Sequence, residues 1–144
     1  MQIKFLRAFD HDLPMPEKDP DDAGYDLMVA EDVTLFPRQV KLVHSGWKCA
    51  IPKGYYGAIK PRSGRGHKEG LVLGNLEGVI DPSYRGEIMI SLWNRKEEGE
   101  PLEIKKGERV CQMIITPYGS PIPKEVDDLD ETERSSGGFG STGN

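Results

Sequence analysis

EIMISLWN (residues 87–94) and RVCQMIIT (residues 109–116) decide the fold class of this chain. Side chains point alternately to the two faces of a β-strand, so a period of two residues predicts a strand. Both stretches alternate in this way, and both alternating sets contain apolar residues, which is typical of strands covered on both faces. We therefore expect two buried strands here.

Shorter stretches of the same kind occur along the rest of the chain. They cover residues 2–7, 32–35, 39–43, 47–51 and 55–60, with turn-forming glycine and proline residues near them at 36–37, 52–54, 105–107 and 118–119. No run of a dozen residues keeps a helical stripe, and the chain has 17 Gly and 11 Pro. This pattern predicts an all-β fold, a jelly-roll-like β-sandwich or barrel.

Length and charge limit the classes of function. The chain has 144 residues, enough for one domain, and a net charge of −5, which argues against general nucleic-acid binding. It contains no apolar run near the roughly 20 residues of a membrane span and begins without a signal-peptide core. Cys49 and Cys111 lie in apolar stretches, so we interpret them as buried free thiols. We expect a cytoplasmic protein with neither membrane nor nucleic acid as partner.

The C-terminus changes composition abruptly. Acidic EVDDLDETE (residues 125–133) passes into RSSGGFGSTGN (residues 134–144), which has too little apolar surface to order itself. We expect a β-domain over residues 1–133 and a flexible arm over residues 134–144.

PRSGRGHKEG (residues 61–70) gathers positive charge and glycine after a predicted strand. Successive backbone N–H groups can form an anion-binding nest, and arginine can bind phosphate oxygens in pairs. The stretch therefore indicates a phosphate site, although a basic surface loop would have the same composition.

Three other polar residues stand out in two short stretches. Asp26 in AGYDL (residues 23–27) could hold a hydrated Mg²⁺ or could be an ordinary turn residue. Arg109 and Gln112 in ERVCQM (residues 108–113) need polar partners if they are buried, and structural bonds would satisfy that need.

GNLEGVIDPSYRGE (residues 74–87) is the most informative stretch. Asp81 follows an apolar pair and precedes Pro82, and Tyr84 belongs to the same turn. An aspartate beside an apolar wall can act as a general base for water, and a tyrosine ring can pack against a sugar. A β-hairpin with an Asp-Pro turn would explain the stretch equally well.

In this order and spacing, AGYDL, PRSG, GNLEGVIDPSYRGE, RVCQ and RSSGGFGSTG resemble the five motifs of the trimeric dUTPase family, in its bacterial type. The resemblance runs from residue 23 to residue 143. It implies a homotrimeric jelly roll that hydrolyses dUTP to dUMP and pyrophosphate with Mg²⁺. This reaction keeps uracil out of DNA and supplies dUMP for thymidylate synthesis. The active sites would be shared between subunits, and a C-terminal arm would close each one.

The resemblance also implies roles for single residues. Asp26 would hold the metal through water, and Asp81 would deprotonate the attacking water. Tyr84 would support deoxyribose and exclude ribose, and Phe139 would stack on uracil. The implied phosphate contacts are Arg62, Ser63, Gly64, Gln112, Arg134, Gly140, Ser141 and Thr142, and the implied uracil pocket is Asn75 with the backbone of Val79, Ile80 and Met89. Arg109 would be structural, at the centre of the trimer.

Two positions depart from the family pattern. Cys111 replaces a small residue, and Ser135 replaces the glycine that usually follows the arm's arginine.

Two rival functions are compatible with this fold. A dCTP deaminase shares the fold but lacks the tyrosine of the Asp-x-x-Tyr turn. A non-catalytic trimeric regulatory protein could also keep the scaffold, because a fold alone does not define a function.

Overall fold

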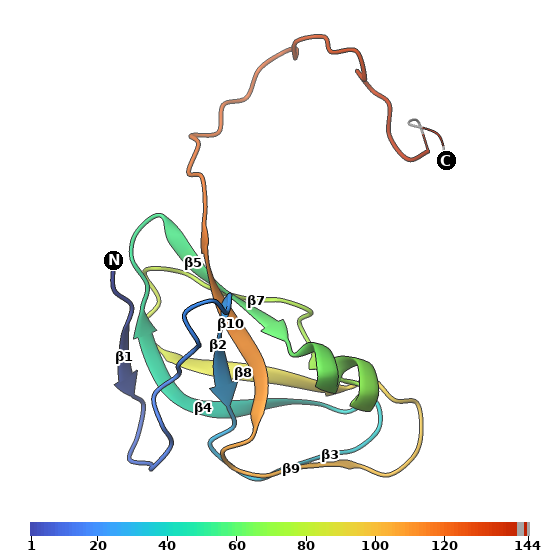
Figure 1. Cartoon of the computed structure of the whole chain (residues 1–144). Coiled ribbons are helices and arrows are strands. Elements are labelled where there is room, and N and C mark those ends of the chain that lie inside the picture. The colour runs from blue at the N-terminus through green and yellow to red at the C-terminus, as the bar shows by residue number, and fades with distance from the viewer. Residues whose placement is uncertain (141–142, 144) are drawn as a thin grey trace.

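Strands make up most of the regular structure in this computed structural model, which describes residues 1–140 and 143 (Figure 1). The strands are β1 (Lys4–Arg7), β2 (Gly24–Met28), β3 (Val33–Leu35), β4 (Val40–Ala50), β5 (Tyr55–Pro61), β6 (Leu71–Leu73), β7 (Gly78–Ile80), β8 (Glu87–Asn94), β9 (Leu102–Ile104) and β10 (Arg109–Pro117). A short π-helical turn, η1 (Arg65–Glu69), lies between β5 and β6. The expected all-β, jelly-roll-like sandwich is confirmed.

Two four-stranded antiparallel sheets form the two layers. One has the order β1-β4-β8-β6 and the other the order β2-β10-β5-β7, while β3 and β9 form a separate two-stranded ribbon. The two stretches with the clearest alternation thus became inner strands, one in each sheet. Inner strands have neighbours on both sides, which explains why their apolar residues are the most continuous in the chain.

The core lies between the sheets. On β8, Ile88, Ile90 and Leu92 are at most 1% exposed, and the residues between them are half-buried. On β10, Val110 and Met113 are equally buried. Burial of this apolar surface is the main favourable term in folding.

The structure differs from the sequence-based expectation at β4. The predicted strands 39–43 and 47–51 are one continuous strand, because the residues between His44 and Lys48 form an irregularity in its pairing with β8 and do not end it. Gly46 has a φ of +79°, a conformation that glycine adopts without steric cost.

Both cysteines are buried and free, as predicted. Burial raises the pKa of Cys49 to about 11 and raises the pKa of Cys111 well above its usual range. These thiols are core side chains.

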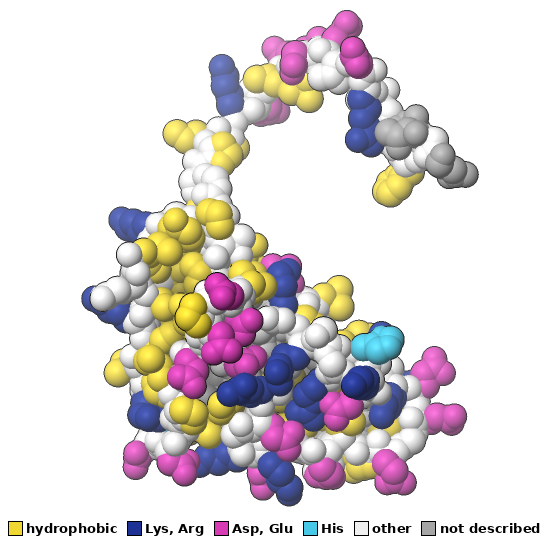
Figure 2. Space-filling model, in the orientation of Figure 1, with side chains coloured by type: hydrophobic (Ala, Val, Ile, Leu, Met, Phe, Trp, Pro, Cys, Tyr) yellow, Lys and Arg dark blue, Asp and Glu magenta, His cyan; other side chains and the backbone are white. Residues whose placement is uncertain are grey.

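After β10 the chain leaves the body of the molecule as an extended segment without helix or strand up to residue 140 (Figure 1). Acidic side chains gather along this segment (Figure 2). Within the described residues, no helix is long and apolar enough to cross a membrane.

Candidate active site

Two cavities contain several residues predicted for the site, and the first is polar, with the basic side chains Arg62, Arg65 and Lys68 beside the acidic side chains Asp22, Asp26 and Glu69. It has a volume of about 480 Å³ and lies between β2, the end of β5, η1 and β10. We call it the basic cavity, and its lining includes the predicted residues Asp26, Arg62, Ser63, Gly64 and Gln112. Three sequence stretches that are far apart in the chain therefore meet at one place.

The carboxylate of Asp26 lies between two arginine side chains. Its Oδ1 lies 3.4 Å from Nε of Arg62, and its Oδ2 lies 3.3 Å from Nη1 of Arg109. All three side chains are partly exposed, at 27%, 39% and 49% respectively, so ligands can reach them. The structure thus places Arg109 against the predicted metal residue, a contact that the sequence did not reveal.

Gln112 fixes the geometry between the strands of this cavity. Its Nε2 donates to the backbone carbonyl of Pro61, the last residue of β5, at 3.1 Å. Gly24 permits the close approach, because a Cβ at that position would lie 2.6 Å from Oε1 of Gln112. Gln112 therefore holds β5 in place directly before Arg62.

The loop after β5 differs in detail from the predicted nest. Gly64 has a φ of −64° and begins η1, so the loop is a helical turn and not a left-handed glycine loop. Arg65 pairs with Glu69 at 2.7 Å and with Glu108 at 2.9 Å, and its side chain is only 17% exposed. Two carboxylates neutralise Arg65, so its side chain links η1 to the residue directly before β10.

The second cavity, with a volume of about 250 Å³, lies at the segment from β6 to β8, where the sequence suggested a hairpin; β7 instead pairs with β5 in one sheet, and β8 pairs with β6 in the other. We call it the hairpin cavity. Every residue of the β-domain that was predicted for the base and the sugar lines it: Asn75, Val79, Ile80, Asp81, Tyr84 and Met89. Buried apolar side chains, among them Ile59 and Ile90, form its floor.

Asp81 and Tyr84 share a tight turn in this cavity. The backbone N–H of Tyr84 donates to the carbonyl of Asp81 at 3.0 Å, as expected for the turn that Pro82 sets. The Tyr84 ring folds back over Gly86, where a Cβ would lie 2.6 Å from Cζ of the ring. Its hydroxyl then donates to the carbonyl of Glu87 at 2.8 Å.

The two cavities have no lining residue in common among those described. One holds the β-domain residues predicted to bind phosphate, and the other holds the β-domain residues predicted to bind base and sugar. The two predicted sets therefore lie in two separate cavities of the chain, which we call half-sites.

The described part of the arm stands away from both half-sites (Figure 1). Phe139 is fully exposed, and Arg134 donates from Nε to the carbonyl of Gly137 at 2.9 Å in a local turn. Gly140 is exposed, while Ser141 and Thr142 lie outside the described residues. Ser135 has a φ of +47°, in the left-handed region that favours glycine.

The described residues contain no group of three or more His, Cys, Asp or Glu side chains that could hold a metal ion. Asp22, Asp26 and Glu69 do line the basic cavity. These carboxylates do not form a site that holds a metal by protein alone, and Asp26 could contribute only one carboxylate to a hydrated Mg²⁺ that takes its other ligands from water and substrate oxygens.

Comparisons with known proteins agree on one family. The dUTPase family model matches residues 12–143. The deoxyuridine 5'-triphosphate nucleotidohydrolase of Thermobifida fusca is 42% identical, over 96% of this chain and 77% of the relative. Its counterpart in Hahella chejuensis is 44% identical, over 98% of this chain and 95% of the relative.

Solved structures give the same result. The dUTPase of Staphylococcus bacteriophage 80alpha with dUpNHpp is 30% identical and superposes with a TM-score of 0.86 over 99% of each chain. The dUTPase of phage phi11 of S. aureus, described with a structural Mg(II) ion, is 26% identical with a TM-score of 0.83, over 91% of this chain and 100% of that one.

Proposed function

The chain belongs to the dUTPase family, and from this premise we propose that its two cavities are the phosphate and nucleoside halves of one dUTP-hydrolysing site. The enzyme hydrolyses dUTP to dUMP and pyrophosphate, which keeps uracil out of DNA and supplies dUMP for thymidylate synthesis. One observation carries the assignment of the site: the residues predicted for phosphate and those predicted for base and sugar each gather in one cavity.

The basic cavity binds the triphosphate. Arg62 is partly exposed and can exchange its contact with Asp26 for phosphate oxygens, which it can bind in pairs. Ser63 and Gly64 add donors at the start of η1, and Gln112 holds β5 in register before them. Phosphoryl transfer depends mainly on positioning and charge neutralisation, and this cavity provides both.

The hairpin cavity binds the deoxyuridine. The backbone of Val79, Ile80 and Met89 and the side chain of Asn75 hydrogen-bond uracil, and they reject cytosine because its amino group reverses the donor pattern. Tyr84 packs against the deoxyribose and leaves no room for a 2′-hydroxyl.

Asp81 is the general base of the reaction. Its exposed carboxylate lines the hairpin cavity beside Tyr84, from where it can orient a water molecule and accept its proton as the water attacks the α-phosphate. The leaving group is pyrophosphate.

Asp26 and the substrate phosphates would hold Mg²⁺ through water. Bound there, the ion would neutralise charge on the phosphate oxygens. The partial exposure of Asp26 supports this assignment, because a hydrated ion can reach its carboxylate from the cavity.

The site is completed by other copies of the chain in a homotrimer. The separation of the two half-sites within one chain supports this arrangement, since neither cavity alone contains a full set of groups. The exposed arm supports it as well. Arg134, Gly140, Ser141 and Thr142 of one copy would hold the terminal phosphates, and Phe139 would cover uracil on a neighbouring copy.

Pyrophosphate release from dUTP, dCTP, UTP and dTTP, with and without Mg²⁺, tests the proposal. We expect rapid release from dUTP alone, and only with Mg²⁺. Conversion of dCTP to dUTP would identify a deaminase, and dUTP binding without turnover would identify a regulatory protein; either result would overturn the assignment.

A further inference from the structure

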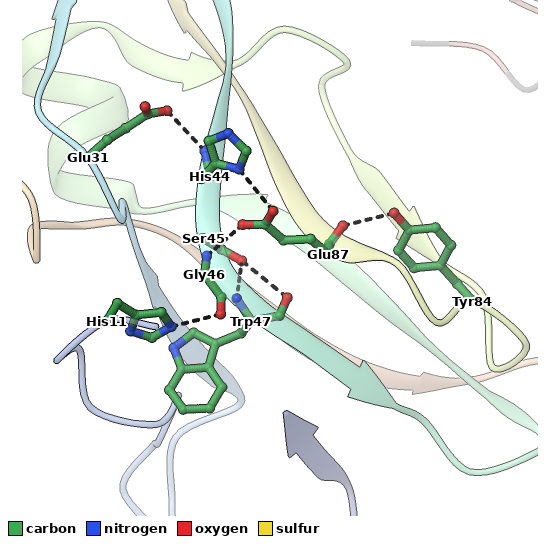
Figure 3. A network of polar contacts seen from close by, with 8 residues as sticks. All are labelled: His11, Glu31, His44, Ser45, Gly46, Trp47, Tyr84 and Glu87. Atoms are coloured by element: carbon green, nitrogen blue, oxygen red, sulfur yellow. Dashed lines mark hydrogen bonds and ion pairs between the residues drawn. The ribbon is translucent and has the colours of Figure 1, made fainter. Parts of the chain in front are cut away.

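Glu87, the first residue of β8, connects the sugar side of the hairpin cavity to a charged network behind it (Figure 3). Its backbone carbonyl accepts the Tyr84 hydroxyl at 2.8 Å. Its carboxylate faces the other way: Oε1 accepts the backbone N–H of Gly46 at 2.8 Å, and Oε2 lies 2.9 Å from Nδ1 of His44. One residue thus joins Tyr84 to β4.

The carboxylate fills an irregularity in the β4–β8 ladder. His44 pairs with Met89 and Lys48 pairs with Glu87, so three residues of β4 lie opposite Ile88 alone. Extra residues on one strand leave backbone groups without ladder partners. Glu87 satisfies one of them, the N–H of Gly46, and its side chain is only 15% exposed. Its position therefore depends on the two contacts of its carboxylate.

Tyr84 depends on Glu87 in turn. The ring is 43% exposed, so packing alone holds it weakly, and its hydroxyl is anchored on the Glu87 carbonyl. A displacement of Glu87 would move that anchor and with it the ring that faces the sugar.

Two carboxylates from different elements face His44. Besides Glu87 on β8, Glu31 in the β2–β3 connection accepts the backbone N–H of His44 at 3.3 Å. The edge of Phe9 lies against the imidazole, with ring centroids 5.7 Å apart. The pKa of His44 is raised above its ordinary value, chiefly by the hydrogen bond to Glu87, with partial desolvation acting in the opposite direction.

The nearby His11 and the side chains around it are not among the groups that shift the pKa of His44. The backbone N–H of Leu13 donates to Nδ1 of His11, so Nε2 is the donor to the Gly46 carbonyl at 2.8 Å. Arg7 lies on the far side of His11, where its Nη1 is 3.0 Å from Nδ1. Lys48 is the ladder partner of Glu87 and the remaining cation of this part of β4.

We propose that His44 and Glu87 are positioning residues for Tyr84, and that their ion pair sets how strictly the enzyme rejects ribonucleotides. The inference rests on the role proposed above for Tyr84. Below the raised pKa, charged His44 holds Glu87 by an ion pair. As pH rises through that pKa, His44 loses its charge and the ion pair becomes a hydrogen bond from a neutral imidazole to the carboxylate, so the constraint on Tyr84 weakens.

Kinetics with dUTP and UTP from about pH 6 to about pH 9 test this, because histidine titrates in that range. We expect the ratio of kcat/KM for dUTP to that for UTP to fall about three- to tenfold through the His44 titration, which is less than the roughly 10- to 150-fold of a whole hydrogen bond between charged groups, because only one of the two charges is lost. His44→Gln and Glu87→Gln should give a low ratio that does not change across the range. Tyr84→Phe should also lose the pH dependence while His44 still titrates. His67→Gln, in η1, is the matched control and should behave like the wild type.

A readout by NMR separates this inference from the proposed activity. His44 and Tyr84 ring signals should titrate together in the wild type, and Tyr84 signals should cease to respond in His44→Gln. A His44 titration without a response at Tyr84 would overturn the inference, whatever the enzyme hydrolyses. A constant dUTP-to-UTP ratio, or a His44→Gln variant with the wild-type profile, would also overturn it. Failure to hydrolyse dUTP at all would instead refute the proposed function. The joint titration of the His44 and Tyr84 ring signals would then still test whether His44 and Glu87 position Tyr84.

Discussion

The separation of the two half-sites predicts that two inactive variants will restore each other's activity. Arg62→Ala removes the guanidinium that faces the basic cavity, and Asp81→Asn removes the carboxylate of the hairpin cavity. Each variant alone is expected to lose turnover by about 10²- to 10⁴-fold, the range found for phosphate-binding and general-base groups. Neither residue lies in the core, so both variants should fold.

The expected recovery follows from the geometry. If the basic cavity of one copy works with the hairpin cavity of its neighbour, a mixed assembly contains some sites with both parts intact. An intact site needs an Asp81→Asn copy on the phosphate side and an Arg62→Ala copy on the nucleoside side. After random exchange of equal amounts each condition holds for half of the positions, so about one quarter of sites should be active.

Pyrophosphate release after mixing, denaturation and refolding of the two variants measures this recovery, and native mass spectrometry verifies that mixed assemblies form. The matched control mixes Arg62→Ala with Asp26→Asn, two changes in the same cavity, which should recover no more activity than either variant alone. Mixed assemblies without recovery in the first experiment would refute the reasoning, because each chain would then build its own site.

Four further predictions concern the arm and the core. Truncation before Arg134 should preserve the fold and the association, measured by circular dichroism and gel filtration, and should lower turnover by about a hundredfold because the substrate loses its cover. Leu92→Ala should lower the free energy of unfolding by about 2–5 kcal/mol, measured in urea, because Leu92 is fully buried. Cys49, whose burial raises its pKa to about 11, and Cys111 should react slowly with an alkylating reagent near neutral pH and rapidly after denaturation; fast reaction of the native protein would contradict this. Ser135→Gly should change kcat/KM by less than about threefold, whereas Ser135→Val should lower it more, since a β-branched residue rarely adopts a positive φ.

Local patterns were sufficient to predict β8, β10 and the turn at Asp81. β8 alternates for eight residues, which is long enough for its period to be recognised, and the structure has the predicted bounds. The hairpin cavity was also predictable, since most of its lining comes from one continuous stretch.

Contacts between distant strands were not predictable. Strands of three residues, such as β7 and β9, are too short to show a period. The contact of Arg109 with Asp26 exists because β10 pairs with β2, and the register between these strands cannot be read from either stretch. The break predicted between residues 43 and 47, a stretch that contains Gly46, was wrong for a related reason. Glycine usually ends a strand pattern, but here the carboxylate of Glu87, from another strand, satisfies its N–H and lets β4 continue.

Ser135 illustrates how a departure from a family pattern can be tolerated. A residue with a side chain costs about 1–2 kcal/mol in the left-handed conformation that Ser135 adopts. The same side chain restricts the free arm relative to glycine, and such restriction is worth about 0.4–1 kcal/mol when the arm orders. Its backbone N–H also donates to the Thr132 hydroxyl at 3.0 Å, which supports the turn directly before the arm's Phe139 and Gly140. The strain is therefore largely offset by lower entropy loss and one local hydrogen bond, so serine can replace glycine at this position at little cost in free energy.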